Sequence, residues 1–394
     1  MTRIIAGEAA EHNTRKVGWG PDTAASTLER VIPRVRDDLR ELSGYHSPQL
    51  DVEVRLNTNE APSRPPEGFS AELARRMSEL SWNRYPDRAA MGLRTAIGEL
   101  EGVDPSRVFV ANGSNEVLQT LCLTYGGHGR TVLTFEPTYA MHGQIARTVQ
   151  CTTVEAERDE RFEVDPDVLR SHVDEYDPSI VFLCSPNNPT GTAERLSTVK
   201  GALDVTPNLL VVDEAYGQFA SFTAADLVDD DVPLVVTRTF SKTWSMAGAR
   251  LGYLIGPRDV VTELEKVVLP YHLDATKQLA GQVALLFVDE MEERVAGIVS
   301  ERRRVAATLH GLGLDVFDSD ANFILFRTSR VAMSGDAVWQ KLVDRSVLVR
   351  NCSGWPRLAD CLRMTIGTPR ENDRFLEAIA SVFAGDSTTT GSAS

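Results

Sequence analysis

Cysteine and histidine are scarce in this chain, and neither residue is spaced for a cross-link or a metal site. The 394 residues include five cysteines, an odd number with no C-x-x-C pair, and seven histidines with no H-E-x-x-H pattern. The cysteines are Cys122, Cys151, Cys184, Cys352 and Cys361. These spacings exclude a disulfide framework and a zinc site, so we expect free thiols in a reducing compartment and no bound metal.

Long apolar runs and an excess of basic residues are also missing. No run reaches the roughly 18 apolar residues that cross a bilayer, so we expect no transmembrane helix and no membrane partner. The first residues, Met1–Glu8, have no apolar core of signal-peptide length, which predicts a cytoplasmic location. Lys and Arg number 41 against 56 Asp and Glu, a net charge of −15, which disfavours a nucleic-acid surface.

Seven short apolar runs between residues 105 and 257 predict the strands of one sheet. Several are continuous runs of Val, Ile, Leu and Phe, which is typical of strands covered by helices on both faces. Helix-like stretches separate them, so we expect an α/β fold with a mostly parallel seven-stranded sheet between helices. The predicted strands are Arg107–Ala111, Thr131–Phe135, Thr152–Ala156, Ile180–Ser185, Leu209–Asp213, Leu234–Thr239 and Leu251–Ile255.

After about residue 275 the pattern changes to that of a smaller α+β domain. We expect one long helix at Lys277–His310 and a final helix at Glu371–Phe383. Apolar runs lie between them at Ala321–Phe326, Val347–Arg350 and Cys361–Ile366. The predicted organisation is a partly flexible arm at 1–40, a segment joining the small domain at 41–80, a large domain at 81–275, a small domain at 276–385 and a disordered tail at 386–394.

Residues at two strand ends predict a phosphate site. The strand ending at Ala111 runs into Asn112–Glu116 and then a helix at Val117–Tyr125. The glycine of this turn permits close backbone approach, a Ser or Asn caps the helix, and the helix N-terminus offers N–H groups to an anion. Such a turn is equally a simple capped helix, but Ser241 and Arg250 supply two further phosphate partners.

Other polar side chains stand where apolar strands end, which is where open α/β sheets bind ligands. Lys242 follows the hydroxyl residues that end one strand. Asp213 ends a Val-rich strand, where a carboxylate requires a partner. Tyr139 follows another strand and offers an aromatic face. Arg363 lies inside an apolar strand and Arg350 closes the one before it; a guanidinium fork suits a carboxylate or a phosphate.

Together these residues resemble those of the fold-type I pyridoxal-phosphate (PLP) enzymes, the class I/II aminotransferases. The likeness is carried by Val235–Tyr253, by Ser185-Pro186-Asn187-Asn188-Pro189-Thr190-Gly191 and by Val211–Tyr216. The resemblance implies that Lys242 holds PLP as a Schiff base and later shuttles a proton. For that role we expect desolvation and nearby positive charge to lower the pKa of Lys242.

The same resemblance implies roles for the other residues. Asp213 would keep the cofactor ring nitrogen protonated, Tyr216 and Asn188 would bind its phenolic oxygen, and Tyr139 would stack on the ring. Lys242, Asp213 and Tyr216 are the expected catalytic residues. The expected phosphate and backbone contacts are Gly113, Ser114, Asn115, Ser241 and Arg250.

More narrowly, the chain from about Asp37 to Ala384 is similar to the histidinol-phosphate aminotransferase family. The stretches that agree are Arg55–Pro62, Arg84–Asp87, Val108–Glu116, Val211–Tyr216, Ala321–Phe326 and Leu362–Gly367. The resemblance implies a homodimer whose interface includes part of 41–80 and in which Tyr85 reaches the PLP phosphate of the other protomer. It implies a substrate site of Tyr45, Asn59, Arg350 and Arg363. The reaction implied, in histidine biosynthesis, converts L-histidinol phosphate and 2-oxoglutarate to imidazole acetol phosphate and L-glutamate.

Two departures keep other reactions open. Ala61 stands where the family commonly has Asn, and the loop Asn351–Arg357 beside Arg350 is unusual and carries Trp355, which could line the side-chain pocket. Both leave the preferred amino donor unsettled, so an aminotransferase for aromatic amino acids is the first alternative. A PLP-dependent decarboxylase of a phosphorylated amino acid is the second, and a PLP-sensing regulator is disfavoured because residues 1–40 are too short for a DNA-binding module.

Overall fold

The computed structural model describes residues 33–40, 42, 44, 48–329 and 333–384. The chain divides into two units, residues 1–40 and 41–394. In the first unit the described part holds a short 3-10 helix, η1 (Asp37–Leu39). Most of the predicted arm and the predicted tail at 386–394 lie outside the described residues. The second unit contains two sheets, one of seven strands and one of five.

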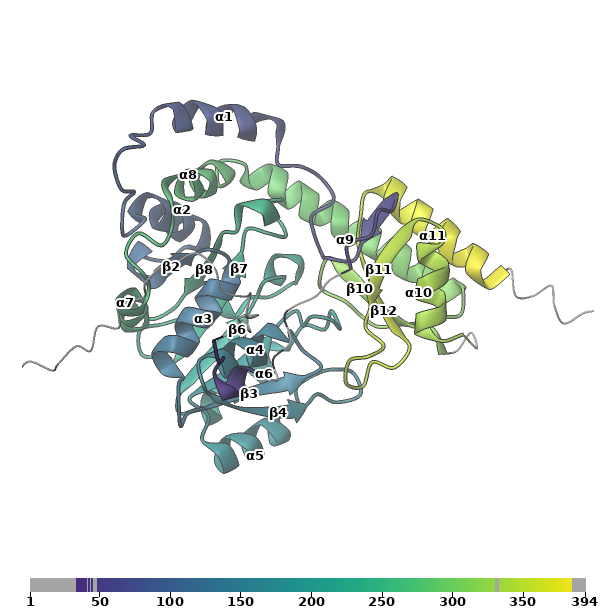
Figure 1. Ribbon diagram of the computed structural model, residues 1–394, viewed down its shortest axis with the longest axis horizontal. Helices are drawn as coiled ribbons and strands as arrows, with labels where there is room; N and C mark the ends of the chain where they lie inside the picture. Colours follow the sequence, from purple (N-terminus) through teal and green to yellow (C-terminus); the bar gives the residue numbers. More distant parts are fainter. Residues whose placement is uncertain (1–32, 41, 43, 45–47, 330–332, 385–394) are drawn as a thin grey trace, which may run out of the picture. The chain divides into compact units, whose positions relative to one another are not determined.

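The seven-stranded sheet has the order β2-β8-β7-β6-β5-β3-β4 (Figure 1). Its strands are β2 (Val108–Ala111), β3 (Thr131–Glu136), β4 (Thr152–Glu157), β5 (Ile180–Cys184), β6 (Leu209–Asp213), β7 (Leu234–Thr239) and β8 (Gly252–Ile255). Only β8 runs antiparallel to its neighbours. Every strand was predicted to within one residue at each end, and the mostly parallel sheet is confirmed.

Helices cover both faces of this sheet, which explains the unbroken apolar runs. In β6, Leu209 and Val211 face one apolar cluster while Leu210 and Val212 face another, because successive side chains of a strand point to opposite faces. One face packs against α3 (Ser114–Tyr125), α4 (Met141–Thr148) and α7 (Arg258–Val267). The other packs against α2 (Met91–Glu101), α5 (Pro166–Tyr176), α6 (Leu196–Val205) and α8 (Ala275–Ala284), and α1 (Glu67–Ser78) lies on α8.

The five-stranded sheet has the order β1-β11-β12-β10-β9 and forms the predicted α+β part. Its strands are β1 (Val54–Leu56), β9 (Asp315–Val316), β10 (Phe323–Arg327), β11 (Val347–Asn351) and β12 (Cys361–Thr365). It packs against α9 (Val288–Gly311), α10 (Gly335–Val343) and α11 (Pro369–Ala384). β1 and β9 were not predicted, because strands of three and two residues are too short to display a pattern.

The prediction of one long helix at Lys277–His310 is wrong. α8 ends at Ala284 and α9 begins at Val288. Phe287, between them, has φ −119° and ψ 44°, which is not helical, and its ring packs against Gly68 of α1. The turn therefore places the Phe287 ring against α1. Beyond the turn, α9 continues toward the five-stranded sheet (Figure 1). Sequence periodicity alone did not reveal this change of direction.

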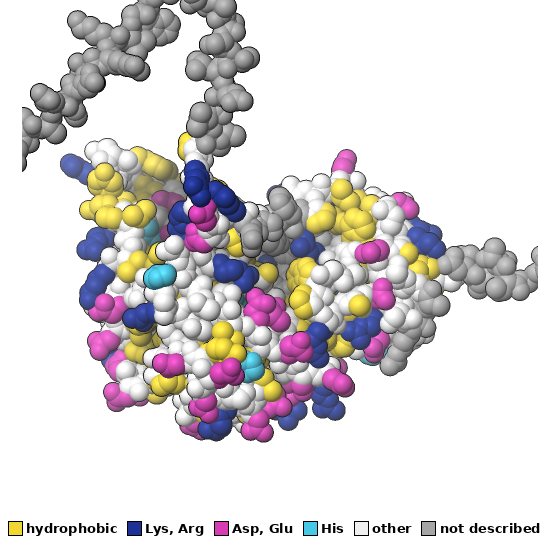
Figure 2. All heavy atoms as spheres, turned by 60° about the horizontal axis from the view of Figure 1, so that its bottom comes forward, with side chains coloured by type: hydrophobic (Ala, Val, Ile, Leu, Met, Phe, Trp, Pro, Cys, Tyr) yellow, Lys and Arg dark blue, Asp and Glu magenta, His cyan; other side chains and the backbone are white. Residues whose placement is uncertain are grey.

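Charged side chains of both signs are interspersed on the face shown in Figure 2. That distribution accords with 56 acidic and 41 basic residues along the chain. Among the described helices, none has the length and apolar composition required to span a membrane.

Candidate active site

Most of the predicted site residues line one cavity of about 550 Å³. β2, β3, β5, β6 and β7 run in one direction, so their carboxyl ends meet at the same edge of the sheet. The cavity opens at this edge. The predicted residues that line it are Asn59, Ser114, Asn115, Tyr139, Asn188, Asp213, Tyr216, Ser241, Lys242, Arg250, Arg350 and Arg363.

Lys242 is held in the cavity with a pKa far below that of an ordinary lysine. Its Nζ donates a hydrogen bond to the carbonyl oxygen of Thr58 at 3.3 Å. Burial, followed by the positive charges of Arg363 and Arg250, lowers the pKa of Lys242 to about 7, although Glu60 opposes the shift. Near neutral pH a large share of this amine is therefore uncharged, as a nucleophile requires.

The predicted phosphate site is built around a glycine that no other residue could replace without strain. Gly113 has φ +84°, and a Cβ on it would lie 2.8 Å from Nη2 of Arg250. The Arg250 Nη1 donates to Oγ of Ser241 at 3.4 Å. The N-terminus of α3, one hydroxyl and one guanidinium thus converge, which is a set of donors suited to a phosphate.

The start of α3 differs from the prediction in two respects. The helix begins at Ser114 and not at Val117, and its N-cap is Gly113 with no side-chain cap. The side chain of Glu116 accepts a hydrogen bond from the backbone N–H of Asn112. The predicted Ser or Asn cap is therefore wrong: no side chain caps the first N–H groups of the helix, and Ser114 and Asn115, at its start, line the cavity.

Asp213 is a buried carboxylate with three protein donors. Its Oδ1 accepts from Oγ1 of Thr237 and from the backbone N–H of Ala215, both at 3.1 Å. Its Oδ2 lies 2.9 Å from Nε2 of His142. The ring of His142 is itself stacked on Phe182 at 4.7 Å. These partners compensate the cost of burying the charge and fix the direction of the carboxylate.

Arg363 joins the small sheet to the loop after β5. Its Nη1 donates to Oδ1 of Asn188, and its Nη2 donates to the carbonyl oxygen of Asn57 at 2.9 Å. Because Oδ1 of Asn188 is engaged, the amide nitrogen is the end of that side chain that can donate to a ligand. The guanidinium also lies 5.2 Å from the ring centroid of Phe323.

Arg350 and Arg363 are Cα partners on the adjacent strands β11 and β12. Their side chains therefore leave the sheet on the same face, and both reach the cavity. The guanidinium of Arg350 lies 5.6 Å from the ring centroid of Trp355, which also lines the cavity. Two like charges placed side by side in this way favour an anionic ligand.

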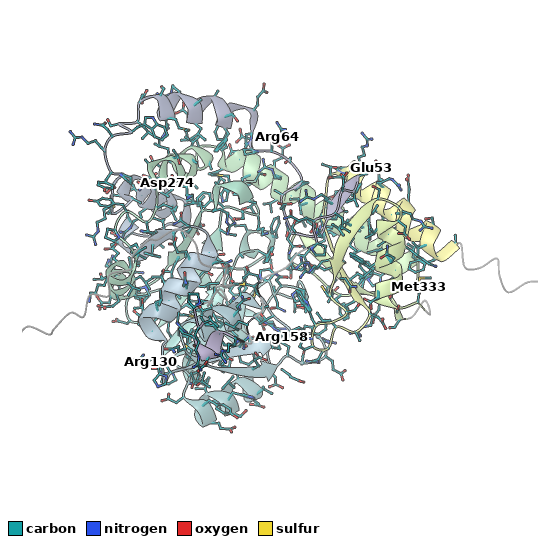
Figure 3. All side chains as sticks on the ribbon, viewed as in Figure 1. Glu53, Arg64, Arg130, Arg158, Asp274 and Met333 are labelled. Carbon is teal, nitrogen blue, oxygen red and sulfur yellow. The ribbon has the colours of Figure 1, made fainter. Side chains whose placement is uncertain are left out.

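The loop between β11 and β12 also contacts the large-sheet part of the chain. Arg357 donates to the carbonyl oxygens of Arg158 and Asp159. Arg158 in turn forms a fully buried ion pair with Glu194. Figure 3 labels Arg158 within the large-sheet part of the chain. The Trp355 loop is thus anchored at a site away from the cavity it lines.

One predicted residue, Tyr85, lies apart from this constellation. Tyr85 is 80% exposed and stacks on Tyr271, with ring centroids 4.5 Å apart. It does not line the cavity of its own chain. Tyr45 lies outside the described residues.

Sequence reasoning missed His142, Thr365 and Glu60. The histidines were considered only for metal spacing, so a histidine positioned behind Asp213 gave no signal. Thr365 follows Arg363 by two residues in β12 and thus shares its face, a signal that could have been used. Glu60 lines the cavity beside Asn59, where Oγ1 of Thr58 donates to it at 2.9 Å.

The donor set fits pyridoxal phosphate. The cradle at Gly113 would be filled by any side chain, and the convergent donors there suit a phosphate. Asp213 presents a buried carboxylate to a ring nitrogen, and Lys242 presents an amine of lowered pKa. The strand-end geometry and these residues define an enzyme of the PLP-dependent aminotransferase type.

Residues 52–379 match the model of the family described as aminotransferase class I and II. The chain therefore belongs to the class I and II aminotransferases, as the sequence resemblance predicted.

Its curated relatives within that family include histidinol-phosphate aminotransferases. The chain is 42% identical to the enzyme of Corynebacterium diphtheriae over 88% of its own length and 96% of the relative. It is 43% identical to that of Thermobifida fusca over 88% and 94% of the two chains. Among solved structures, the histidinol-phosphate aminotransferase of Sinorhizobium meliloti in complex with pyridoxal-5'-phosphate has a TM-score of 0.83, with 21% identity over 90% of this chain and 99% of that one.

Proposed function

We propose that this enzyme binds pyridoxal phosphate and transfers an amino group between L-histidinol phosphate and 2-oxoglutarate, giving imidazole acetol phosphate and L-glutamate in histidine biosynthesis. The observation that carries the proposal is the one cavity lined by Lys242, Asp213, Ser241 and Arg250, with Gly113 packed against Arg250 at its edge. The relatives named for this reaction, at 42–43% identity, support the choice of substrate.

In this proposal each cofactor contact has a protein group of matching chemistry. Gly113, Ser114, Asn115, Ser241 and Arg250 hold the phosphate. Asp213 would hold the ring nitrogen, Tyr139 would cover the ring, and Asn188 and Tyr216 would donate to the phenolic oxygen; all four line the cavity. When bound, the cofactor supplies an electron sink that lets a bond at the substrate α-carbon break.

Lys242 would both hold the cofactor and move protons. As an uncharged amine its Nζ would accept the proton from the substrate α-carbon and give it up again later in the reaction. The lowered pKa of about 7 makes the uncharged amine available near neutral pH. The carbonyl of Thr58, 3.3 Å from Nζ, keeps the amine in the cavity.

The paired arginines account for two chemically different substrates. Histidinol phosphate carries a phosphate and no α-carboxylate, whereas glutamate carries carboxylates. Arg350 and Arg363, as strand partners, offer two planar forks to either anion in turn. Asn59 and Tyr45 complete the proposed substrate site, Asn59 by closing the cavity beside Tyr216.

We further propose a homodimer in which Tyr85 reaches the cofactor phosphate of the other protomer. Large apolar side chains near Tyr85 are exposed, including Trp82 at 70% and Leu269 at 77%. Exposed aromatic residues of this kind are typical of surfaces that bind another chain. The domain boundaries at 81, 276 and 386 and a cytoplasmic location belong to the same proposal; the five cysteines, all free and buried, support the location.

The experiment that tests the function measures glutamate formed from histidinol phosphate and 2-oxoglutarate by the purified enzyme. The proposal predicts glutamate production that depends on both substrates. Phenylalanine as a better donor would establish the aromatic aminotransferase instead, and release of carbon dioxide from phosphothreonine would establish the decarboxylase. Either result would contradict the proposal.

A further inference from the structure

Asn59 occupies an unusual position between the two sheets. It is buried, with 1% of its surface exposed, and its φ of 55° lies in the left-handed region. Its backbone N–H donates to Oγ1 of Thr365 at 2.9 Å, and its Nδ2 donates to the hydroxyl of Tyr216 at 2.9 Å. Its Oδ1 accepts from Oγ1 of Thr365 at 3.0 Å. The residue thus connects Thr365 of β12 with Tyr216, which follows β6.

The direction of each hydrogen bond in this chain is fixed. A hydroxyl has one hydrogen, and Oγ1 of Thr365 already accepts from the backbone N–H of Asn59. The Thr365 hydrogen therefore points at Oδ1 of Asn59. The other end of the amide is then the NH₂ group, which can only donate, so the oxygen of Tyr216 accepts and its own hydrogen is directed elsewhere.

The opposite orientation of the amide is less stable. If Asn59 were flipped, its NH₂ group would face Thr365 and its oxygen would take the hydrogen of Tyr216. Oγ1 of Thr365 would then accept two hydrogen bonds while its own buried hydrogen lost its acceptor. An unsatisfied buried donor costs more than a hydrogen bond contributes. In the observed orientation it is the Tyr216 hydrogen that has no acceptor within this chain of hydrogen bonds, but Tyr216 lines the cavity, where a ligand can accept it, whereas Thr365 is buried and does not line the cavity. Thr365 therefore selects the amide orientation that leaves the Tyr216 hydrogen free to point into the cavity.

Tyr216 itself is held in one place and keeps its proton. Its ring meets Phe323 edge to face, with centroids 5.0 Å apart. Burial raises the pKa of the Tyr216 phenol well above its ordinary value, although Arg363 and the Asn59 hydrogen bond oppose the shift. The phenol lines the cavity that contains Lys242.

We propose that Thr365 and Asn59 are positioning residues that direct the hydroxyl hydrogen of Tyr216 at the phenolic oxygen of the bound cofactor. The inference rests on the proposed function, because it concerns the cofactor held by Lys242. A hydrogen bond donated to that oxygen stabilises its negative charge. Because a neighbouring negative charge favours the protonated nitrogen, a hydrogen bond that draws this charge toward Tyr216 lowers the pKa of the Lys242 nitrogen in its linkage to the cofactor.

Several charged and titratable groups share this environment and stay unchanged in the test. They are the cations Arg250 and Arg363, the carboxylates Asp213 and Glu60, and the neutral Tyr139 and Cys184. None of them is removed by a substitution at Thr365. A shift of the cofactor's titration midpoint in a Thr365 variant therefore reports the chain of hydrogen bonds from Thr365 through Asn59 to Tyr216, which we call the relay.

The test is a pH titration of the visible absorption of the cofactor-loaded enzyme. Thr365→Val removes the hydroxyl and keeps the side-chain shape, so we expect the titration midpoint to rise by about one pH unit. Thr365→Ser retains the hydroxyl and should keep the wild-type midpoint. Asn59→Gly keeps the left-handed backbone without the amide, and should raise the midpoint in the same way if Thr365→Val does not fold.

A double-mutant comparison separates the relay from a general structural effect. In a Tyr216→Phe background the relay has no hydrogen to direct, so adding Thr365→Val should produce no further rise. An equal rise in both backgrounds, or an unchanged midpoint in folded Thr365→Val and Asn59→Gly, would overturn the proposal. A wild-type enzyme with no visible absorption after loading would instead refute the cofactor assignment.

Discussion

At the scale of single residues, burial and like charges determine what Lys242 can do. The amine is enclosed by the cavity and faces Arg363 and Arg250, and these surroundings lower its pKa to about 7. The same surroundings would be unfavourable for a lysine whose only role was structural, because burying its charged form removes its hydration and costs free energy. The position is therefore explained by chemistry that uses the uncharged amine.

A first prediction concerns the pH dependence of cofactor attachment. The rate at which cofactor-free enzyme links PLP should rise through about pH 7, because the lowered pKa makes the uncharged amine predominate above that value. Arg363→Leu removes the largest like charge and should move the profile to higher pH. Stopped-flow absorbance measures both. Lys242→Ala is the control and should show no covalent attachment and no transamination; a visible absorption band retained by this variant would disprove the role of Lys242.

A second prediction concerns Asp213. Asp213→Asn keeps the size of the side chain and should still allow cofactor binding. It should lower kcat by roughly 10²-fold or more, because the ring nitrogen loses the carboxylate that holds its proton. Steady-state kinetics with a parallel binding titration separates the two effects. Near-normal turnover in a fully loaded variant would refute the assigned role.

At the scale of elements, the strands and their ends were the predictable part. Continuous apolar runs such as Leu209–Asp213 reveal a doubly covered strand, and polar residues at their ends stand out against that background. The break between α8 and α9 could not be read from sequence, because Phe287 leaves the helix to pack on a residue some two hundred positions away. His142 was similarly hidden, because its role comes from a contact across the fold with Asp213. Asn59 was predicted as a substrate residue, but its contact with Tyr216 could not be predicted from the sequence.

A third prediction tests the turn between β2 and α3. Gly113→Ala should weaken PLP binding about tenfold or more, because its Cβ would lie 2.8 Å from Nη2 of Arg250 and its φ is +84°. Gly102→Ala is a matched control: Gly102 also has positive φ, 68°, but nothing lies within 4 Å of its Cβ. The control should lower the melting temperature and leave PLP affinity unchanged. Equal affinities in both variants would argue against a phosphate site at this turn.

At the scale of the whole molecule, the exposed aromatic surface requires an explanation that the single chain does not supply. Trp82 and Tyr85 are large, apolar and exposed, and Tyr85 is already ordered by stacking on Tyr271. Side chains fixed in place lose little entropy on binding, which suits them to the proposed contact with a second copy of the chain.

A fourth prediction follows for mixed dimers. Lys242→Ala and Tyr85→Ala protomers should each be impaired alone, yet form an active hybrid when unfolded and refolded together. One hybrid site then combines an intact Lys242 with an intact Tyr85 from the other chain. About a quarter of wild-type activity is expected, because half of the dimers are hybrids with one intact site of two. No recovery in a mixture shown to contain hybrids would place the action of Tyr85 within its own chain.

The most direct test of the whole account is a paired half-reaction. The PLP-loaded enzyme is mixed with L-histidinol phosphate and, separately, with L-phenylalanine, and loss of the visible cofactor absorbance is followed. The account predicts fast conversion by histidinol phosphate and slow conversion by phenylalanine, because Arg350 and Arg363 are placed to bind a phosphate. Faster conversion by phenylalanine would contradict it, and would identify an aromatic aminotransferase whose ring pocket includes Trp355.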